Sequence, residues 1–111
     1  VWDHGDTFFD QMPRSVLQSN WYYGLDFGPE VNYSQAYVDL EKHGYDQIPT
    51  GSNWSAGENL ARTVAYCRDQ IAPERLFGFM QTVWKPTVSS CREQHMQALD
   101  LVGQAIGTWS E

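Results

Sequence analysis

The chain has 111 residues, the size of a single domain, and its hydrophobic fraction of 41% is typical of a globular protein rather than a disordered tail. Its net charge is −7 and no run of Lys or Arg occurs, which argues against nucleic acid and anionic membrane surfaces as partners. No apolar stretch approaches the roughly 18 residues that span a bilayer. Aromatic residues make up 14% of the chain, which is rich for a domain of this size.

The first elements are short. Residues 1–4, Val-Trp-Asp-His, are typical of the end of a strand whose beginning is missing, so we expect a partial domain cut from a longer protein. Pro13 forbids a continuing helix, and only about ten residues precede the next strand, which allows at most one short helical turn. Residues 15–20 form the second strand. A loop shaped by Gly24, Gly28 and Pro29 follows.

A helix is predicted over residues 34–43, because Tyr33, Tyr37 and Leu40 recur at helical spacing and Gly44 provides a left-handed stop. Residues 46–52 form the third strand. Pro49 cannot donate to a strand ladder, so we expect a bulge or irregular pairing there.

The next helix spans about residues 57–71, and Pro73 ends it. Its apolar face consists of Leu60, Val64, Cys67 and Ile71.

Residues 76–83 are predicted to form the fourth strand, apolar on both faces as buried parallel strands tend to be. The last helix begins near a capping Thr87 or Ser89 and ends at Gly107. Its inward face is predicted to comprise Val88, Cys91, His95, Ala98, Val102 and Ala105.

Strands that alternate with helices indicate an α/β fold with parallel strands and right-handed crossover helices. A complete (βα)8 (TIM) barrel takes about 250 residues, so this chain corresponds to between three and four βα units. We therefore expect residues 1–111 to be a single partial (βα)8-barrel domain, half of a barrel and about its strands 5–8. A small doubly wound sheet is the alternative.

Parallel α/β folds place their sites at the carboxyl ends of the strands. At those ends this chain combines flat aromatic faces with short amide and hydroxyl groups, a mixture that suits the binding of sugars. The alternative is that the tryptophans are buried as part of the hydrophobic core at the mouth of the barrel. The Ser-Asn-Trp tripeptide occurs at two of these ends. The candidate substrate-binding residues are Asp3, His4, Asn20, Trp21, Tyr22, Tyr23, Asn53, Trp54, Thr82, Trp84 and Lys85.

Catalytic groups are harder to find. Glycoside hydrolysis normally uses two carboxylates, yet Asp3 is the one carboxylate expected directly at a strand end, so the catalytic residues are unknown. His43 and His95 lie on predicted helices, where they cannot complete a metal site with His4. No metal or other cofactor is expected. Cys67 and Cys91 could pair, although two buried free thiols are the commoner arrangement.

Taken together, residues 1–4, 16–23 and 78–84 resemble the last strands of a glycoside hydrolase barrel, nearest to the family 20, β-N-acetylhexosaminidase-like type. In that family one strand ends in Trp plus an acidic residue, a later strand ends in a Tyr-rich segment, and the final strand carries a Gly-x-x-x-x-x-Trp pattern. Here Lys85-Pro86-Thr87 follows the final Trp, where the family usually has a Glu.

The resemblance implies a sugar pocket walled by Trp21, Trp54 and Trp84, with Tyr22 or Tyr23 near the substrate. It also implies a catalytic Asp-Glu pair upstream of Val1 and a secreted or periplasmic location. The chain by itself should bind carbohydrate weakly and hydrolyse nothing. Its expected partner is a missing amino-terminal half barrel or a second copy. The alternative function is a non-catalytic sugar- or protein-binding α/β module.

Overall fold

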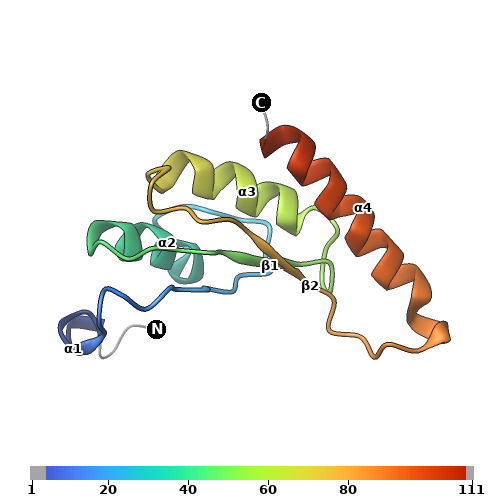
Figure 1. The fold of residues 1–111 in the computed structure, drawn as a ribbon, viewed down its shortest axis with the longest axis horizontal. Coiled ribbons are helices and arrows are strands. Elements are labelled where there is room, and N and C mark those ends of the chain that lie inside the picture. The colour runs from blue at the N-terminus through green and yellow to red at the C-terminus, as the bar shows by residue number, and fades with distance from the viewer. Residues whose placement is uncertain (1–4, 110–111) are drawn as a thin grey trace.

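The computed structural model describes residues 5–109 as a small α/β domain with a parallel sheet (Figure 1). In chain order the elements are α1 (Gly5–Gln11), α2 (Asn32–Lys42), β1 (Thr50–Ser52), α3 (Asn59–Gln70), β2 (Met80–Thr82), the 3-10 turn η1 (Ser89–Cys91) and α4 (Arg92–Trp109). The alternation of parallel strands and helices agrees with the predicted fold class. The strand end predicted at residues 1–4 lies outside the described residues.

The sheet is built around the central segment that contains β1. Strands β1 and β2 pair in parallel, with Thr50 opposite Met80 and Ser52 opposite Thr82. On the other side, residues 17–22 run beside β1 through isolated parallel bridges that join Gln18 to Gln47 and Trp21 to Thr50. Three extended segments therefore lie side by side in chain order, and their carboxyl ends meet at one edge of the sheet. The strand predicted over residues 15–20 is not continuous, because regular pairing among the described residues is confined to β1 and β2 and the first segment joins them only through isolated bridges.

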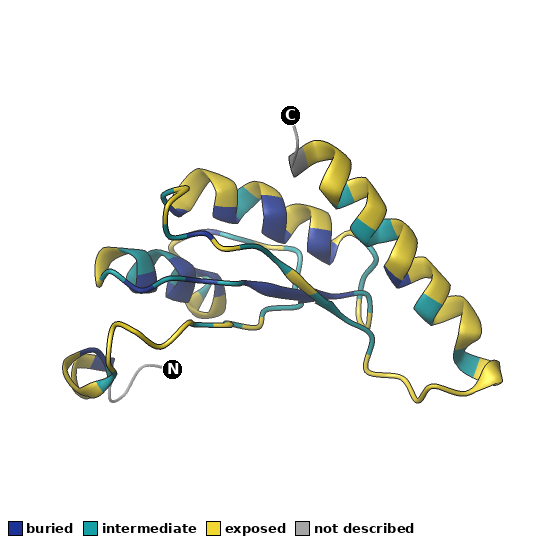
Figure 2. Cartoon of the chain, in the orientation of Figure 1, coloured by how far each residue is buried: buried dark blue, intermediate teal, exposed yellow. Residues whose placement is uncertain are grey.

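Both α2 and α3 cover the same face of the sheet. Tyr37 of α2 forms one buried cluster with Cys67 and Ile71, on and just after α3, and with Leu76 at the start of the last extended segment. The predicted apolar face of α3 is confirmed, since all four of its residues are buried. Figure 2 shows the burial concentrated on β1 and on the sides of the two helices that face the sheet.

A second cluster closes the amino-terminal end of the domain. Phe9 of α1 packs with Leu40 and Tyr45, and the His43 ring stacks on Phe9 with centroids 3.8 Å apart. The prediction of a single helical turn before Pro13 was wrong, because α1 has seven residues. Packing of its aromatic side chains against α2 stabilises a helix that would be too short to persist alone.

The irregular pairing predicted near Pro49 is present. Between the Gln47–Leu76 bridge and the Thr50–Met80 pair, one segment advances by three residues and the other by four. The extra residue lies in the stretch that contains Gly78, whose φ is +156°. Pro49 has no N–H to donate, but its carbonyl still accepts a hydrogen bond from the Met80 N–H at 3.0 Å. The extra residue forms a bulge, and parallel pairing continues both before and after it.

Three details of the helices differ from prediction. Tyr33, which shares the helical spacing of Tyr37 and Leu40, is exposed in the first turn of α2, whereas Tyr37 and Leu40 are buried. Val88 was assigned to the inward face of α4 but is exposed and precedes the helix. Gly107 does not end α4, which continues to Trp109 because a helical Gly costs only about 1 kcal/mol.

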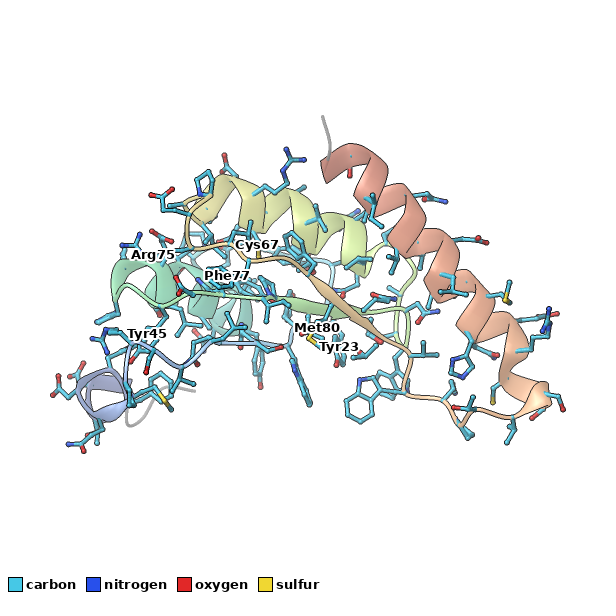
Figure 3. All side chains as sticks on the ribbon, in the orientation of Figure 1. Tyr23, Tyr45, Cys67, Arg75, Phe77 and Met80 are labelled. Atoms are coloured by element: carbon cyan, nitrogen blue, oxygen red, sulfur yellow. The ribbon has the colours of Figure 1, made fainter. Side chains whose placement is uncertain are left out.

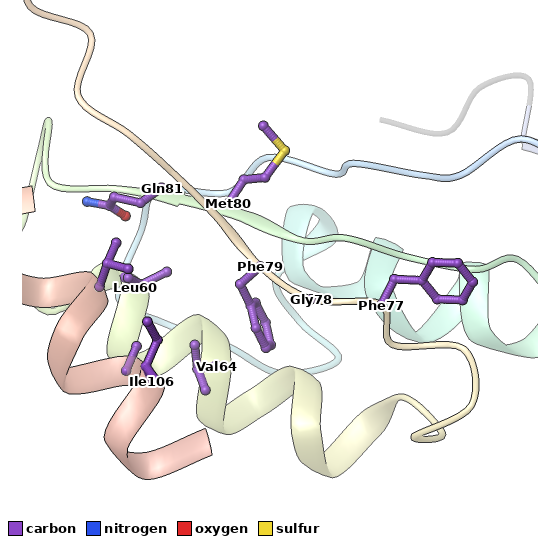
Figure 4. A pocket seen from close by; sticks show the side chains of 10 residues that line it. Leu60, Val64, Phe77, Gly78, Phe79, Met80, Gln81 and Ile106 are labelled. Carbon is purple, nitrogen blue, oxygen red and sulfur yellow. The ribbon is translucent and has the colours of Figure 1, made fainter. Parts of the chain in front are cut away.

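The face of the sheet opposite α2 and α3 carries no helix among the described residues. Leu76 points toward the helices, so Phe77 points away, and beyond the bulge Phe79 faces α3 while Met80 projects to the other side (Figure 4). Phe77 is 63% exposed and Met80 46%. The prediction that residues 76–83 are buried on both faces was therefore wrong: in the described part of the chain this segment is an edge strand with one side uncovered.

Side chains of the other two extended segments, which alternate between the two faces of the sheet, also lie on this uncovered face. Ser19 and Thr50 lie side by side on it, since their hydroxyl groups are 2.6 Å apart. Leu17, two residues before Ser19, and Ile48, two residues before Thr50, therefore share that side. We call the surface formed by Leu17, Ile48, Phe77 and Met80 the open apolar face.

Candidate functional site

Two of the predicted tryptophans meet at the carboxyl ends of the strands. Trp21 ends the first extended segment and Trp84 follows β2, on opposite sides of the central strand. Their ring centroids are nevertheless 5.5 Å apart, with an interplanar angle of 65°. Trp21 is 54% exposed and Trp84 55%. The two indoles form a partly exposed edge-to-face pair, which we call the indole pair.

A chain of hydrogen bonds ties the indole pair to the sheet. The Trp84 Nε1–H donates to the Tyr23 hydroxyl at 2.7 Å, and the Tyr23 and Thr82 hydroxyls are 3.1 Å apart. The Thr82 hydroxyl donates to the Gly51 carbonyl at 3.2 Å. Because each hydroxyl has one proton, Thr82 must accept from Tyr23. All the donors then point one way, from the exposed indole into the backbone of β1.

Trp84 itself has an uncommon backbone conformation. Its φ of 59° makes it the one non-glycine residue with a positive φ among residues 5–109. That conformation costs a bulky residue of the order of 1–3 kcal/mol and persists only where surrounding contacts hold it. Here the contacts are the Tyr23 hydrogen bond and the Trp21 ring.

A shallow depression of about 360 Å³ lies beside the indole pair. It is lined by Trp21, Tyr22, Tyr23, Gly24, Tyr33 and Ser55. The Ser55 hydroxyl donates to the Tyr23 carbonyl at 2.9 Å, which joins the loop after β1 to the loop after the first strand. Burial, followed in size by the nearby Asp26 charge, raises the pKa of the Tyr22 hydroxyl. The lining is aromatic with few polar groups, which is typical of a small-molecule site.

The two predicted asparagines have structural partners. The Asn20 side-chain amide donates to the Tyr33 carbonyl at 3.2 Å. The Asn53 amide donates to the Gln94 carbonyl at 3.0 Å and to Gln97 Oε1 at 2.8 Å, which fastens the end of β1 to α4. Their equivalent positions in the repeated Ser-Asn-Trp tripeptide suggested a common role in binding. In the folded chain each amide donates to a residue of a helix.

The remaining predicted residues are dispersed. Trp54 is exposed, but its ring makes no aromatic contact with Trp21 or Trp84 in the described part of the chain. Lys85 is exposed next to Trp84. Asp3 and His4 lie outside the described residues. The structure thus brings together Trp21, Tyr22, Tyr23, Thr82 and Trp84.

Asn59, the first residue of α3, is a residue that sequence reasoning missed. Its side chain is fully buried, and its Nδ2 donates to the carbonyls of Tyr22 at 3.0 Å and Gly24 at 2.6 Å. Its Oδ1 accepts from the Ser52 N–H at 2.9 Å. The available signal was a polar residue directly before Leu60, the first residue of the apolar helical pattern.

Groups for general acid–base or metal chemistry are scarce at this edge of the sheet. None of the residues that line the depression is Asp or Glu. Residues 5–109 contain no group of three or more His, Cys, Asp or Glu able to hold a metal ion. Cys67 and Cys91 are free thiols, as expected, but only Cys67 is fully buried. Its burial raises the thiol pKa well above the ordinary range.

A separate apolar cavity of about 260 Å³ lies on the helix-covered side, between α3, α4 and the free edge of β2 (Figure 4). Leu60, Val64 and Phe79 line it from α3 and the edge strand, and Val102, Ala105 and Ile106 line it from α4. It lacks charged side chains and is separated from the indole pair by the sheet. Its lining does not suit a sugar.

Comparison of the chain with models of protein families, with curated proteins and with solved structures finds no match. Among residues 5–109, no helix has both the length and the apolar character needed to cross a membrane.

Proposed function

We propose that this chain is part of a carbohydrate-active protein and that the indole pair lines its sugar-binding pocket. The observation that carries the proposal is the contact between Trp21 and Trp84, 5.5 Å apart at the carboxyl ends of parallel strands and more than half exposed. An indole left exposed to water forgoes the free energy that its burial in a core would provide. It does, however, present a flat face on which the C–H face of a sugar ring can stack.

The architecture we propose is the carboxy-terminal half of a (βα)8 barrel of the family 20 glycoside hydrolase type. Two features support it. The helices α2 and α3 cover one face of a parallel sheet, and the opposite face is apolar and uncovered, as the inner wall of a barrel would be before closure. The partner that completes the wall is an amino-terminal half barrel or a second copy.

The chemistry we propose is divided between this chain and residues that precede it. The depression beside the indole pair has no carboxylate in its lining, whereas glycoside hydrolysis requires a positioned acid and a base or nucleophile. This chain therefore provides pocket walls, and an upstream Asp-Glu pair provides catalysis. The same shortage of carboxylates also favours the alternative, a sugar-binding module without catalysis.

The binding proposal is tested by titrating the chain with N-acetylglucosamine and its dimer while recording ¹⁵N-HSQC spectra. We expect weak binding, with a Kd on the order of 1 mM, and shifts of the Trp21 and Trp84 indole N–H signals. Trp84→Ala should weaken binding at least about 5-fold, because it removes one stacking face. Trp54→Ala is the matched control, since Trp54 is equally exposed but lies outside the pair.

Equal weakening by both substitutions, or shifts confined to other parts of the chain, would contradict the site. Catalysis is measured separately with a chromogenic N-acetylhexosaminide. Turnover by this chain alone would contradict the proposal that it only lines the pocket and that the catalytic carboxylates lie upstream.

A further inference from the structure

We propose that Tyr23 is a positioning residue, whose hydroxyl holds the Trp84 indole in place so that the indole pair is formed before any ligand binds. The importance of this role for binding rests on the proposed function, whereas the holding itself does not. The sequence suggested a different role for Tyr23, that of a substrate-binding residue.

The Tyr23 hydroxyl uses its hydrogen-bonding capacity within the protein. The Tyr23 hydroxyl accepts from Trp84 Nε1 and donates to Thr82, so its one proton is committed within the protein. The Thr82 proton is committed to the Gly51 carbonyl. A ligand hydroxyl that accepted a bond from Tyr23 would have to break this chain, which ends in the backbone of the central strand.

The backbone conformation of Trp84 requires an external support. A bulky residue with a φ of 59° and a side chain 55% exposed has little packing to hold it. Its two identified side-chain contacts are the Tyr23 hydroxyl and the edge-to-face contact with Trp21. Without the hydroxyl, the indole would be free to rotate away from Trp21.

Tyr23 is itself well anchored. The Ser55 hydroxyl donates to its carbonyl, and Asn59 fixes the carbonyls of the residues on either side, Tyr22 and Gly24. Tyr23 and Met80 both lie on the side of the sheet away from α3 (Figure 3). An anchored tyrosine thus acts as a rigid support for a less constrained tryptophan.

This arrangement determines how the site can recognise a ligand. The Trp84 Nε1–H is occupied, so the indole presents only its ring to the solvent. A ligand is therefore held at this corner through its C–H surface, and its hydroxyl groups must find partners elsewhere. Preorganisation of this kind raises affinity because no side chain has to be ordered on binding.

The test is Tyr23→Phe, which keeps the ring and removes the hydroxyl. Tyr33→Phe is the matched control, since Tyr33 lines the same depression but its hydroxyl makes no hydrogen bond in the described part of the chain. The readout is hydrogen exchange of the Trp84 indole N–H by NMR, with its signal assigned from Trp84→Phe. We expect exchange about 2- to 10-fold faster in Tyr23→Phe and unchanged exchange in Tyr33→Phe.

Thr82→Val provides a second variant, because it removes the group that accepts the Tyr23 proton and should also speed the exchange. Unchanged Trp84 exchange in both variants would overturn the proposal, whatever the binding data. N-acetylglucosamine titration then separates the two claims. Faster exchange with weaker sugar binding supports both, whereas faster exchange in a chain that never binds sugar supports the positioning role and rejects the proposed function.

Discussion

The side-chain oxygen of Asn59 accepts a hydrogen bond from the backbone N–H of Ser52 at 2.9 Å, and this bond joins the start of α3 to the last residue of β1. The amide nitrogen of the same side chain reaches the loop after the first extended segment. One buried side chain therefore holds two neighbouring strand ends in register beneath the indole pair.

Replacement of Asn59 by Ala should lower the free energy of unfolding by about 2–4 kcal/mol, because it removes one buried and two partly buried hydrogen bonds and leaves the Ser52 N–H unsatisfied. Urea unfolding followed by circular dichroism measures the loss. The control is Asn32→Ala at the exposed start of α2, where the change should stay within about 0.5 kcal/mol. A loss of equal size in both variants would contradict this role for Asn59.

Two glycines should respond to Ala substitution with opposite signs. A Cβ on Gly51 would lie 2.8 Å from Asn59 Oδ1 and 3.2 Å from the Leu60 Cα, so Gly51→Ala should cost about 1–3 kcal/mol through overpacking. A Cβ on Gly103 of α4 would meet no atom within 4 Å. Gly103→Ala should therefore stabilise the chain by about 0.5–1 kcal/mol through helix propensity. A thermal unfolding midpoint of Gly51→Ala at or above that of the wild type would count against the packing of α3 on β1.

Stability should fall at alkaline pH. Burial raises the folded-state pKa of the Cys67 thiol above the unfolded value of about 8.5, so folding favours the protonated form. Below about pH 8.5 the thiol is protonated in both the folded and the unfolded chain, so the stability associated with its raised pKa is fully present. Above it the unfolded chain releases a proton that the folded chain keeps, and the free energy of unfolding drops by up to about 1.4 kcal/mol per pH unit. Buried Tyr37 adds a second such loss above about pH 10.

Urea unfolding between pH 7 and 11 measures this dependence. Cys67→Ala should flatten the profile between about pH 8.5 and 10, at the cost of a smaller core. Cys91→Ala is the matched control, because that thiol is only partly buried. A profile that stays equally steep in Cys67→Ala would show that other groups cause the alkaline loss.

The open apolar face should make the isolated chain associate. Phe77 and Met80 expose contiguous apolar surface beside the edge of β2, whose outer side is unpaired in the described residues. We expect sedimentation velocity at tens of micromolar to reveal species larger than a monomer. Met80→Lys should shift them toward the monomer, while Ala61→Lys on the exposed side of α3 should not. A wild-type chain that remains monomeric would favour a self-contained module over a half barrel.

Local sequence patterns predicted much of this fold. Leu60, Val64, Cys67 and Ile71 recur at helical spacing, and a helix with one apolar stripe can bury it only against another element. Pro49 cannot donate to a ladder, which made an irregular pairing there predictable. Gly44, with a φ of +81°, follows α2 as a left-handed stop for the same local reason.

The composition of the site was partly predictable as well. Strands that alternate with helices place their carboxyl ends together, and this was sufficient to predict that Trp21, Tyr23, Thr82 and Trp84 share one edge of the sheet. The repeated Ser-Asn-Trp tripeptide did not reveal the helix contacts of Asn20 and Asn53. Whether an amide faces a ligand or a helix depends on neighbours that are distant in sequence, here Tyr33, Gln94 and Gln97.

The sequence by itself determined the periodic features, namely the order of strands and helices and their common polarity, because these depend on chemistry within a few residues of the chain. Only the tertiary structure decided which indoles touch, that Tyr23 supports Trp84, and that Asn59 joins two loops. Those are contacts between groups far apart in sequence, and their geometry emerges only when the strands are paired.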